Sequence, residues 1–384
     1  MAQETIDRES FRPVAQRASG FAALKEKHPE LIVVDQYRKN LEELFLLRNP
    51  KYRFDKNYAA DFGAFAKEHF GAKTEDEAGS WFYFPWRNAL VHFLAEELHE
   101  ELRTGRNRYL ITVEEQKAFY GATIGILGMS VGSHAAMTIA MTGGAKQIKL
   151  ADPDSLSGDN LNRIRTGFHN VGVNKAVATA RDISEINPYA AVEISSEGIR
   201  EENAEKFLEG VDVLLEVMDN PYWKLKVREL ARARGIPVIM GTDNGDGNIV
   251  DIERYDLDKN YPILHGYAGG LTAEGLKNMP PQDLPKVAAR IAGANLAVPR
   301  MLGSVAEVGK SLYSWPQLGT AANLCGTTLA YLSRRIALKD PKIKSGRYQV
   351  SLDSVFESGY RWGWLSRKIA FAKFIKKMMR QQKP

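Results

Sequence analysis

Cysteine is the residue that this sequence has least of, with a single copy, Cys325, among 384 residues. One cysteine excludes an intrachain disulfide and a structural zinc site of the four-cysteine type, so we expect no structural zinc. Long hydrophobic runs are also missing, since no stretch reaches the roughly 18 apolar residues that cross a membrane. The start, MAQETIDRESFRPVAQ, has no cationic segment that leads into an apolar one. We therefore expect no membrane span, no secretory signal and a cytoplasmic location.

A strong excess of one charge is absent as well. The formal net charge is +5, with 26% charged and 44% hydrophobic residues, which is the balance of an ordinary globular protein. The length favours two domains over one. Because a mildly basic chain suits a phosphate-bearing small ligand as well as nucleic acid, the charge does not decide between these partners.

Residues 1–120 show apolar side chains at helical spacing, in LIVVDQYRKNLEELFLL and again in NALVHFLAEELHEELR. We expect a helical N-terminal region here that selects a substrate or a partner. His92, Glu96 and His99 would share one face of the second helix, and a solvated face is a better interpretation than a metal site because no other ligands accompany them. The aromatic run Trp81–Trp86 is expected to fill a core or an interdomain seam.

From Thr123 onward, short apolar runs alternate with helical segments. This alternation predicts an α/β fold, a Rossmann-like and mostly parallel sheet with helices on both faces, over residues 121–340. The stretch GNIVDIERYDL is expected to extend the sheet, in the antiparallel sense. Residues 259–318 are rich in Gly and Pro and are predicted to be a crossover region, after which GTAANLCGTTLAYLSRRIAL resumes as a helix. Residues 341–384 form a basic tail, whose amphipathic end suits an anionic surface or packing by its apolar side.

A turn rich in small residues follows the first predicted strand, in GILGMSVGSHAAM. Gly128, Ser130 and Gly132 lie between a strand and a helix, where small residues let backbone N–H groups approach a phosphate. The pattern is an imperfect G-x-G-x-x-G, because Ser130 stands where a glycine is usual. The same five residues also spell G-x-S-x-G, the nucleophile elbow of α/β-hydrolases.

The residues that follow favour a nucleotide. Asp152 lies about 20 residues past the last glycine of the turn, where a Rossmann site needs an acidic group for ribose hydroxyls. Asn160 and Arg163 in DNLNR, Lys175 in GVNKA and Asp219 in LLEVMDN come next. They combine a guanidinium and an ammonium that pair with phosphate and a carboxylate that suits magnesium, near strand ends that share one sheet edge.

In this order, the elements GMSVGS, ADPD, SGDNLNR, GVNK, EINP and MDN resemble the ThiF/MoeB/HesA superfamily of ubiquitin-activating-enzyme-like adenylyltransferases, over residues 121–257. Upstream, RTGRNRYLITVEEQ resembles the R-Y-x-R-Q element of these proteins, and Arg106 matches the arginine that enters the partner subunit's site. The resemblance implies ATP and Mg²⁺ as cofactors and a homodimer.

Carried over by position, the resemblance implies a role for each residue. The turn of Gly128, Ser130 and Gly132 would hold the nucleotide, and Asp152 the ATP ribose. Asn160 and Arg163 would bind the phosphates, Lys175 would lie at the α-phosphate, Asp219 would bind Mg²⁺, and Arg106 would act in trans.

The implied reaction is attack of a carboxylate on the α-phosphorus of ATP, which gives an acyl adenylate and pyrophosphate. The substrate is the C-terminus of a small, ubiquitin-like carrier protein or a peptide, or a carboxylate on a small molecule or a tRNA. Nucleic acid enters only as that tRNA substrate. Positioning and charge neutralisation can supply most of the catalysis, so no general base is required.

Two departures from the family bear on the later steps. The pair of C-x-x-C motifs that holds zinc in many relatives is missing, and residues 259–318 contain no cysteine. Because Cys325 lies in an apolar helical segment, where a buried and inert thiol is usual, we expect no thioester step. Two alternatives remain: an α/β-hydrolase with Ser130 as nucleophile and His265 as its histidine, and a non-catalytic ATP-binding scaffold.

Overall fold

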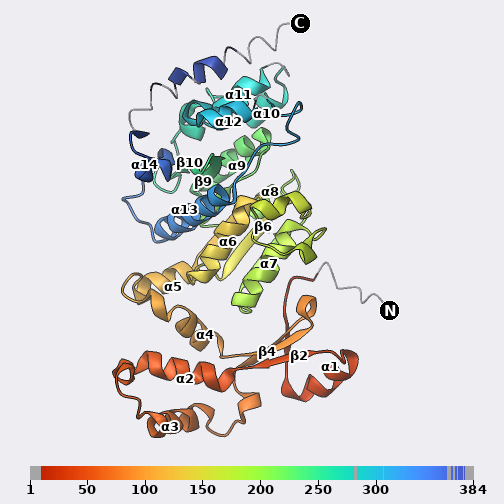
Figure 1. Cartoon of the computed structure of the whole chain (residues 1–384), viewed down its shortest axis with the longest axis vertical. Helices are drawn as coiled ribbons and strands as arrows, with labels where there is room; N and C mark the ends of the chain where they lie inside the picture. The colour runs from red at the N-terminus through yellow and green to blue at the C-terminus, as the bar shows by residue number, and fades with distance from the viewer. Residues whose placement is uncertain are drawn as a thin grey trace.

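The computed structural model describes residues 10–280, 283–305, 307–360, 365, 368–369, 371–374 and 376. The described chain runs from an N-terminal region at the bottom of Figure 1, through a central sheet, to a group of short helices at the top.

The N-terminal region contains a sheet as well as helices, so the expectation of a purely helical region was wrong. Its four strands have the order β1-β3-β4-β2, with β2 parallel to β4 and the other pairs antiparallel. The strands are β1 (Val14–Gln16), β2 (Ile32–Asp35), β3 (Ser80–Phe84) and β4 (Ala89–Phe93). The helices are α1 (Phe21–Lys27), α2 (Tyr37–Arg48), α3 (Ala59–Phe70), α4 (Glu96–Arg103) and α5 (Val113–Gly121).

The error has a clear local cause. Each segment with helical spacing begins with a β-branched or aromatic run that pairs in the sheet, and the helix starts only after it. His92 is therefore a strand residue and not a member of a helix face with Glu96 and His99. It is 2% exposed, and its ring stacks between Trp81 and Tyr37 at centroid distances of 4.1 and 4.3 Å. His92 is a core histidine, neither solvated nor a metal ligand.

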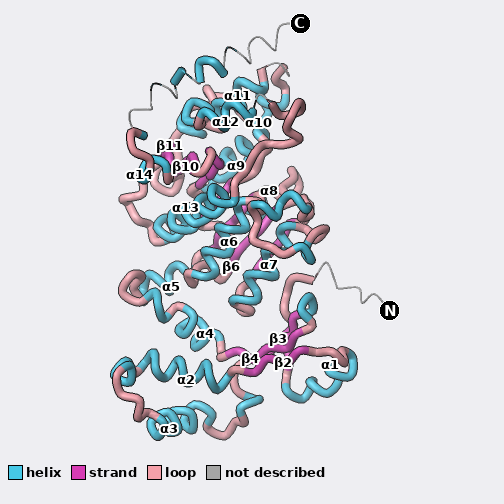
Figure 2. The backbone as a smooth tube through the Cα atoms, viewed as in Figure 1, coloured by secondary structure: helices cyan, strands magenta, loops and turns pink. Residues whose placement is uncertain are grey.

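The central sheet has seven strands in the order β11-β10-β9-β8-β5-β6-β7. Figure 2 shows strands of this sheet in magenta among the helices around it. The five strands from β9 to β7 are parallel, and β10 and β11 are added antiparallel at one side. The strands are β5 (Thr123–Leu127), β6 (Gln147–Ala151), β7 (Ala191–Ser195), β8 (Val213–Glu216), β9 (Val238–Asn244), β10 (Gly247–Glu253) and β11 (Gly346–Val350). This confirms the predicted Rossmann-like, mostly parallel sheet and its antiparallel extension.

Helices cover both faces of this sheet. One hydrophobic cluster joins Ile124 and Ile126 of β5 to α6 (Val131–Met141), α7 (Lys175–Ile186) and α13 (Gly319–Ala337). A second cluster joins Leu127 and Leu214 to α8 (Ala204–Phe207) and α9 (Pro221–Arg234) on the opposite face. The central parallel strands β5 and β8 are buried on both faces, which explains why TIGIL and VDVLLEV read as nearly continuous apolar runs.

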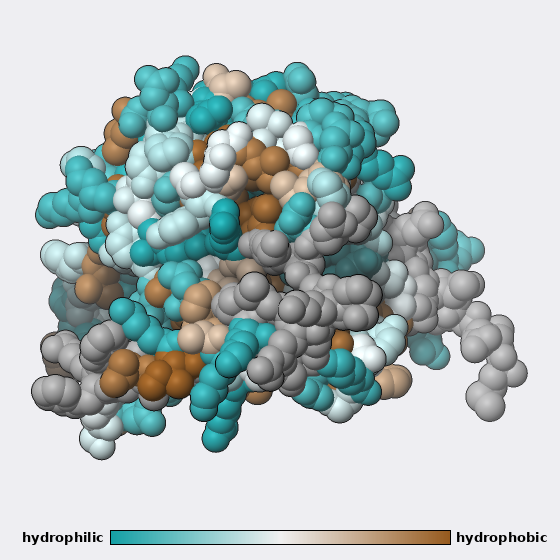
Figure 3. Space-filling view, turned by 90° about the horizontal axis from the view of Figure 1, so that it is seen from above, coloured by the Kyte–Doolittle hydropathy of each residue, from teal (hydrophilic) through white to brown (hydrophobic). Residues whose placement is uncertain are grey.

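The crossover region consists of short helical pieces, at the top of Figure 1. They are η8 (Ile263–Gly266), α10 (Ala273–Lys277), α11 (Leu284–Ile291), η9 (Ala294–Leu296) and α12 (Pro299–Val305). Seen from this end, hydrophobic and hydrophilic residues are mixed on the surface (Figure 3).

The segment 341–384 is not wholly a tail, because β11 within it pairs with β10 of the central sheet. The short helix α14 (Asp353–Phe356) follows. Most of the basic amphipathic end that the sequence analysis singled out lies outside the described residues. Within the described part of the chain, no helix has the length and apolarity needed to cross a bilayer.

The N-terminal region is joined to the central domain by specific polar contacts. Glu185 of α7 accepts hydrogen bonds from the Trp86 indole at 2.6 Å and from Arg87 Nε at 2.8 Å. Near the end of α6, Arg103 donates to the carbonyl of Ala140 at 2.6 Å. The aromatic run from Trp81 to Trp86 therefore fills the small sheet and contributes to the seam, as the composition predicted.

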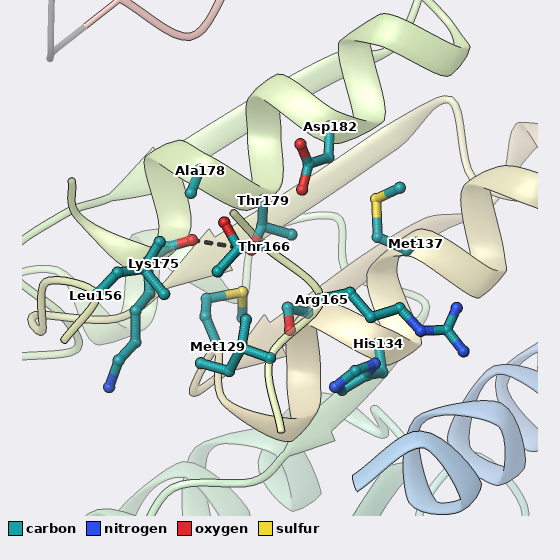
Figure 4. A pocket seen from close by; sticks show the side chains of 12 residues that line it. Met129, His134, Met137, Leu156, Arg165, Thr166, Lys175, Ala178, Thr179 and Asp182 are labelled. Carbon is teal, nitrogen blue, oxygen red and sulfur yellow. Dashed lines mark hydrogen bonds between the residues drawn. The ribbon is translucent and has the colours of Figure 1, made fainter. Parts of the chain in front are cut away.

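A small cavity lies between α6, α7 and the segment that follows β6 (Figure 4). Apolar side chains such as Met129 and Met137 line it, and the carboxylate of Asp182 points into it. Burial, with a further contribution from Glu185, raises the pKa of Asp182 to about 6. An ionised carboxylate is costly in such surroundings, so Asp182 keeps its proton to a higher pH than a solvent-exposed aspartate does.

The packing of α13 on α6 depends on a glycine, which gives a first prediction. A Cβ atom at Gly326 would lie 2.3 Å from Cβ of His134 and 2.8 Å from the backbone nitrogen of Ala135. Gly326→Ala should therefore lower the free energy of unfolding by about 1–3 kcal/mol. Gly63→Ala on α3 is the matched control, because no atom lies within 4 Å of its Cβ. The control should be neutral or stabilising by up to about 1 kcal/mol. Equal denaturant midpoints for the two variants would contradict this packing.

A second prediction concerns the pH dependence of stability. In the unfolded chain, the pKa of Asp182 has its ordinary value of 3.8. Because its pKa is higher in the folded state, the folded state binds the proton more tightly than the unfolded chain does. The stabilising contribution of Asp182 is thus complete below about pH 4 and is lost as the pH rises through about 6. Relative to Asp182→Asn, the wild type should lose about 1–2 kcal/mol between pH 4 and pH 7 in urea titrations. Parallel curves for the two proteins would refute this assignment, and Glu202→Gln serves as a surface control.

Candidate active site

The candidate site lies at the edge of the sheet where the parallel strands end. The chain passes from β5 to β6 and β7 on one side and returns to β8 on the other, so β5 and β8 flank the topological switch point. Loops that leave adjacent strands in opposite directions open a crevice there, which is the usual ligand position in open α/β sheets.

The turn between β5 and α6 touches the loop that follows β8. Gly128 has a φ of +90°, and a Cβ atom on it would lie 2.7 Å from the carbonyl oxygen of Val217. Only glycine fits this backbone contact. Gly132, in the first turn of α6, is also closely packed, with Ile126 Cγ2 2.9 Å from its Cβ position. The turn brings the start of α6 to the switch point, where its N–H groups can face an anion.

Asp152, immediately after β6, holds the turn in place. Its carboxylate accepts the N–H of Met129 at 2.5 Å and the N–H of Asp154 at 2.8 Å. Asp152 is 5% exposed, and burial raises its pKa although these N–H groups and Lys175 oppose the shift. A carboxylate has roughly four acceptor positions, so two remain for other donors.

Arg163 reaches the turn from the segment after β6. Its Nε donates to Oγ of Ser130 at 3.3 Å, and its Nη1 donates to Oδ1 of Asn162 at 2.9 Å. The serine that replaces the usual glycine thus supplies an acceptor for this guanidinium. Asn160 is 5% exposed and is used locally, since its Oδ1 accepts the N–H of Ser157 at 3.3 Å.

Lys175 is the first residue of α7, and Asn174 caps this helix by accepting the N–H groups of Ala176 and Val177. The Lys175 ammonium pairs with Asp154 at 2.9 Å. Lys175 also lines the cavity of Figure 4 together with Met129 of the turn. The D-x-D element and the G-x-x-K element are therefore adjacent in space.

Asp219 lies in the loop after β8, beyond Val217, and its side chain is exposed. The structure adds a residue that the sequence analysis missed, Asp243, near the end of the neighbouring strand β9. Asp243 accepts hydrogen bonds from Asn248 Nδ2 at 3.1 Å and from Gln317 Nε2 at 3.4 Å. Burial raises its pKa to about 6, and the charge of Asp219 adds to the shift while Arg163 opposes it. Its position at the carboxyl end of a predicted parallel strand, like that of Asp219, was the available signal.

Arg106 does not lie at this edge of the sheet. It is an exposed residue of the turn Gly105–Asn107, whose Asn107 side chain bonds to the carbonyl of Thr142 just beyond α6 at 3.1 Å. The candidate site is at the other end of α6, a helix of 11 residues and about 16 Å.

The histidines do not support a hydrolase. Nε2 of His265 is 2.8 Å from Asp251 Oδ1, and Nδ1 is 3.0 Å from the Tyr261 hydroxyl, so both ring nitrogens are engaged away from Ser130. His134 lies one turn after Ser130, but its Nε2 donates to the carbonyl of Arg163 at 2.6 Å. Ser130 thus has no histidine base among these two.

No group of three or more His, Cys, Asp or Glu side chains suited to a metal ion occurs in the described ranges. Magnesium in nucleotide enzymes is usually held by one or two carboxylates together with phosphate oxygens and water. An exposed carboxylate in a loop that touches the turn before α6, as Asp219 is, fits that requirement.

Comparisons with solved structures find similar chains at low sequence identity. The chain is similar to the E. coli tRNA N6-threonylcarbamoyladenosine dehydratase TcdA, with 20% identity and a TM-score of 0.46 over 63% of this chain and 96% of that one. It is also similar to E. coli MccB in complex with AMPCPP and MccA, with 14% identity and a TM-score of 0.40 over 78% of this chain and 79% of that one.

Among curated proteins, the chain is 37% identical over 282 residues to the uncharacterized protein MT1398 of Mycobacterium tuberculosis (strain CDC 1551 / Oshkosh). The match covers 73% of this chain and 39% of the relative, so the chain spans well under half of that protein. Residues 104–353, which include the whole central sheet, match the profile of the ThiF family. The chain belongs to the ThiF family.

Proposed function

We propose that this protein uses Mg²⁺ and ATP to adenylate a carboxylate. The observation that supports this most strongly is the meeting of the Gly128 turn, Arg163 and Lys175 at one sheet edge, in a chain of the ThiF family. In the reaction, a carboxylate oxygen forms a bond to the α-phosphorus of ATP while the bond from that phosphorus to the bridging oxygen breaks. The products are an acyl adenylate and pyrophosphate, and no proton needs to be transferred.

Each site residue would have a role that follows from its charge and its position. The turn at Gly128, Ser130 and Gly132 offers N–H groups to phosphate, and Arg163 and Lys175 neutralise charge on the transferred group. Asp152, which keeps two free acceptor positions, would receive the ribose hydroxyls.

Asn160 would assist at the phosphates after release from its local bond. Asp219, with Asp243 on the adjacent strand, would hold Mg²⁺. The bound ion would neutralise charge on the leaving pyrophosphate.

A thioester step is not part of the proposal. Cys325 is fully buried in α13, where its sulfur lies 2.3 Å from the position that a Cβ atom on Gly241 would take. Burial raises the pKa of this thiol well above its ordinary value. A thiol that is neither accessible nor ionised cannot attack an acyl adenylate. The acyl group would therefore pass directly to an acceptor outside the chain.

The substrate carboxylate would belong to the C-terminus of a small carrier protein or a peptide, or to a small molecule or a tRNA. The N-terminal region, with its own sheet and helices, would select it. The alternative of a non-catalytic ATP-binding scaffold shares the same pocket and differs only in turnover.

The active unit would be a homodimer in which Arg106 completes the partner's site. Arg106 lies near the C-terminal end of α6, whereas the Gly128 turn lies at the start of this helix, about 16 Å away along its axis, which favours a role in the partner's site. Tyr109 and Leu110, close to it in the chain, are 101% and 84% exposed, and Met141 at the nearby end of α6 is 57% exposed. Such apolar exposure beside a guanidinium suits a surface that a second copy covers.

The metal assignment predicts the behaviour of Asp219→Asn. A neutral amide is a poorer ligand for a hard divalent cation, so pyrophosphate–ATP exchange in the presence of candidate carboxylates should fall on the order of 10²-fold. Calorimetry should also show that Mg²⁺ no longer strengthens ATP binding. Glu202→Gln, at an exposed position, should behave as wild type. Exchange retained in Asp219→Asn would remove the metal assignment, and ATP binding without exchange for any carboxylate would favour the scaffold.

The dimer predicts complementation between two inactive variants. Arg106→Ala and Asp219→Asn should each lose exchange, yet mixed subunits should recover roughly a quarter of wild-type activity, because half of the dimers are mixed and each carries one intact site. Arg53→Ala, at an exposed arginine of the N-terminal region, should stay active. Full activity of an isolated monomer, or no recovery in dimers shown to be mixed, would contradict the trans role of Arg106.

A further inference from the structure

Four buried charged side chains connect β8, α9 and β10. Glu216, the last residue of β8, accepts from Lys224 Nζ at 3.0 Å and from Arg228 Nη1 at 2.7 Å. Nε of the same Arg228 donates to Glu253 of β10 at 2.6 Å. Glu216, Arg228 and Glu253 are 0% exposed and Lys224 is 8% exposed. Two carboxylates and two cations cancel, which makes the burial of these charges tolerable.

At one end, this network holds the loop that carries Asp219. Oε1 of Glu216 also accepts the N–H of Met218 at 2.9 Å, so the side chain folds back onto the backbone two residues later. Burial acts to raise the pKa of Glu216, but Lys224 and Arg228 outweigh it and hold that pKa below its ordinary value. The carboxylate remains ionised and is a strong acceptor for the loop.

At the other end, the network holds the first turn of the crossover region. Oε1 of Glu253 accepts the N–H of Leu264 at 2.7 Å and the hydroxyl of Tyr255 at 2.7 Å. Leu264 and His265 have φ values of +49° and +56°, which L-residues other than Gly, Asn and Asp adopt at a cost of roughly 1–2 kcal/mol each. The strained turn therefore depends on the same carboxylate that binds Arg228.

The turn also positions the helices after it. Leu264 is fully buried in a cluster with Leu225 of α9 and with Ala273 and Leu276 of α10. The N–H of Ala273 donates to Glu229 of α9 at 2.8 Å. A shift in the position of Leu264 would therefore also move α10, which packs on α9, the helix that carries Arg228.

We propose that Glu216, Arg228 and Glu253 are positioning residues that couple the Asp219 loop to the turn at Leu264, so that Mg–ATP bound at the loop stabilises the start of the crossover region. The planar guanidinium uses different nitrogens for the two carboxylates, so it cannot follow one without disturbing its bond to the other. The coupling rests on the proposed function, because that function places Mg–ATP beside Asp219.

Hydrogen–deuterium exchange of the full chain, with and without Mg–ATP, tests this coupling. In the wild type, Mg–ATP should slow exchange at least about fivefold both in residues 213–219 and in residues 262–268. In Arg228→Lys, the net charge is kept but one ammonium cannot bridge two carboxylates as the guanidinium does. Protection should persist in 213–219 and disappear in 262–268. Arg234→Lys is the matched control on the same helix, because Arg234 forms only a surface pair with Glu205 at 3.0 Å.

Glu253→Gln tests the same link from its far end and replaces Arg228→Lys if that variant does not fold. It too should lose the response in 262–268 alone. The proposal is overturned if a folded Arg228→Lys or Glu253→Gln variant keeps the full response, or if the wild type responds only in 213–219. A wild type that responds in neither segment refutes the nucleotide site itself, which separates a failure of the proposed function from a failure of the coupling.

Discussion

The contact between the backbone of Gly128 and the carbonyl of Val217 is the constraint on which the site depends. It brings the turn before α6 against the loop after β8, at the point where the strand order reverses. A side chain at residue 128 would separate the two loops. The start of α6, the anchor Asp152 and the loop of Asp219 would then no longer share one crevice. A single glycine with positive φ thus relates the elements that we propose bind phosphate to the loop that we propose holds Mg²⁺.

At this edge, some polar and charged side chains are held by hydrogen bonds within the chain, and Asp219 is exposed. Asp152 accepts the N–H of Met129 and Asn160 accepts the N–H of Ser157, so hydrogen bonds within the chain hold both side chains in this structure. Arg163 is held through Ser130, where the family's usual glycine would offer no acceptor. Asp219 stays exposed and can adapt to an ion and its waters. Polar groups held in place around one exposed carboxylate suit the proposed phosphoryl chemistry, in which positioning and charge neutralisation dominate.

The buried charged side chains of β8, α9 and β10 contrast with the mostly apolar interior of the central sheet. Most buried side chains of the parallel strands are apolar and need no partners, whereas Glu216 of β8 and Glu253 of β10 require Lys224 and Arg228 within hydrogen-bond reach. Replacing such a network by apolar side chains often preserves stability, so its presence here favours a role in geometry. The short helices of the crossover region pack on α9 through a cluster that contains Leu225, Leu264 and Leu276, so their position depends on that helix.

The sequence by itself determined the alternation of strands and helices from Thr123 onward, the turn of small residues after β5 and the ordered motifs, because these depend on local periodicity and on residue types at fixed spacing. The sequence pattern misassigned the N-terminal region, where strand pairing between distant segments outweighs the helical spacing. It also placed His92 on a solvated face, whereas this side chain is stacked in a core. Only the tertiary structure showed that Asp243 joins Asp219, that β11 completes the sheet and that Arg106 lies at the far end of α6. These relations arise from chain reversals between segments remote in sequence, which no local pattern encodes.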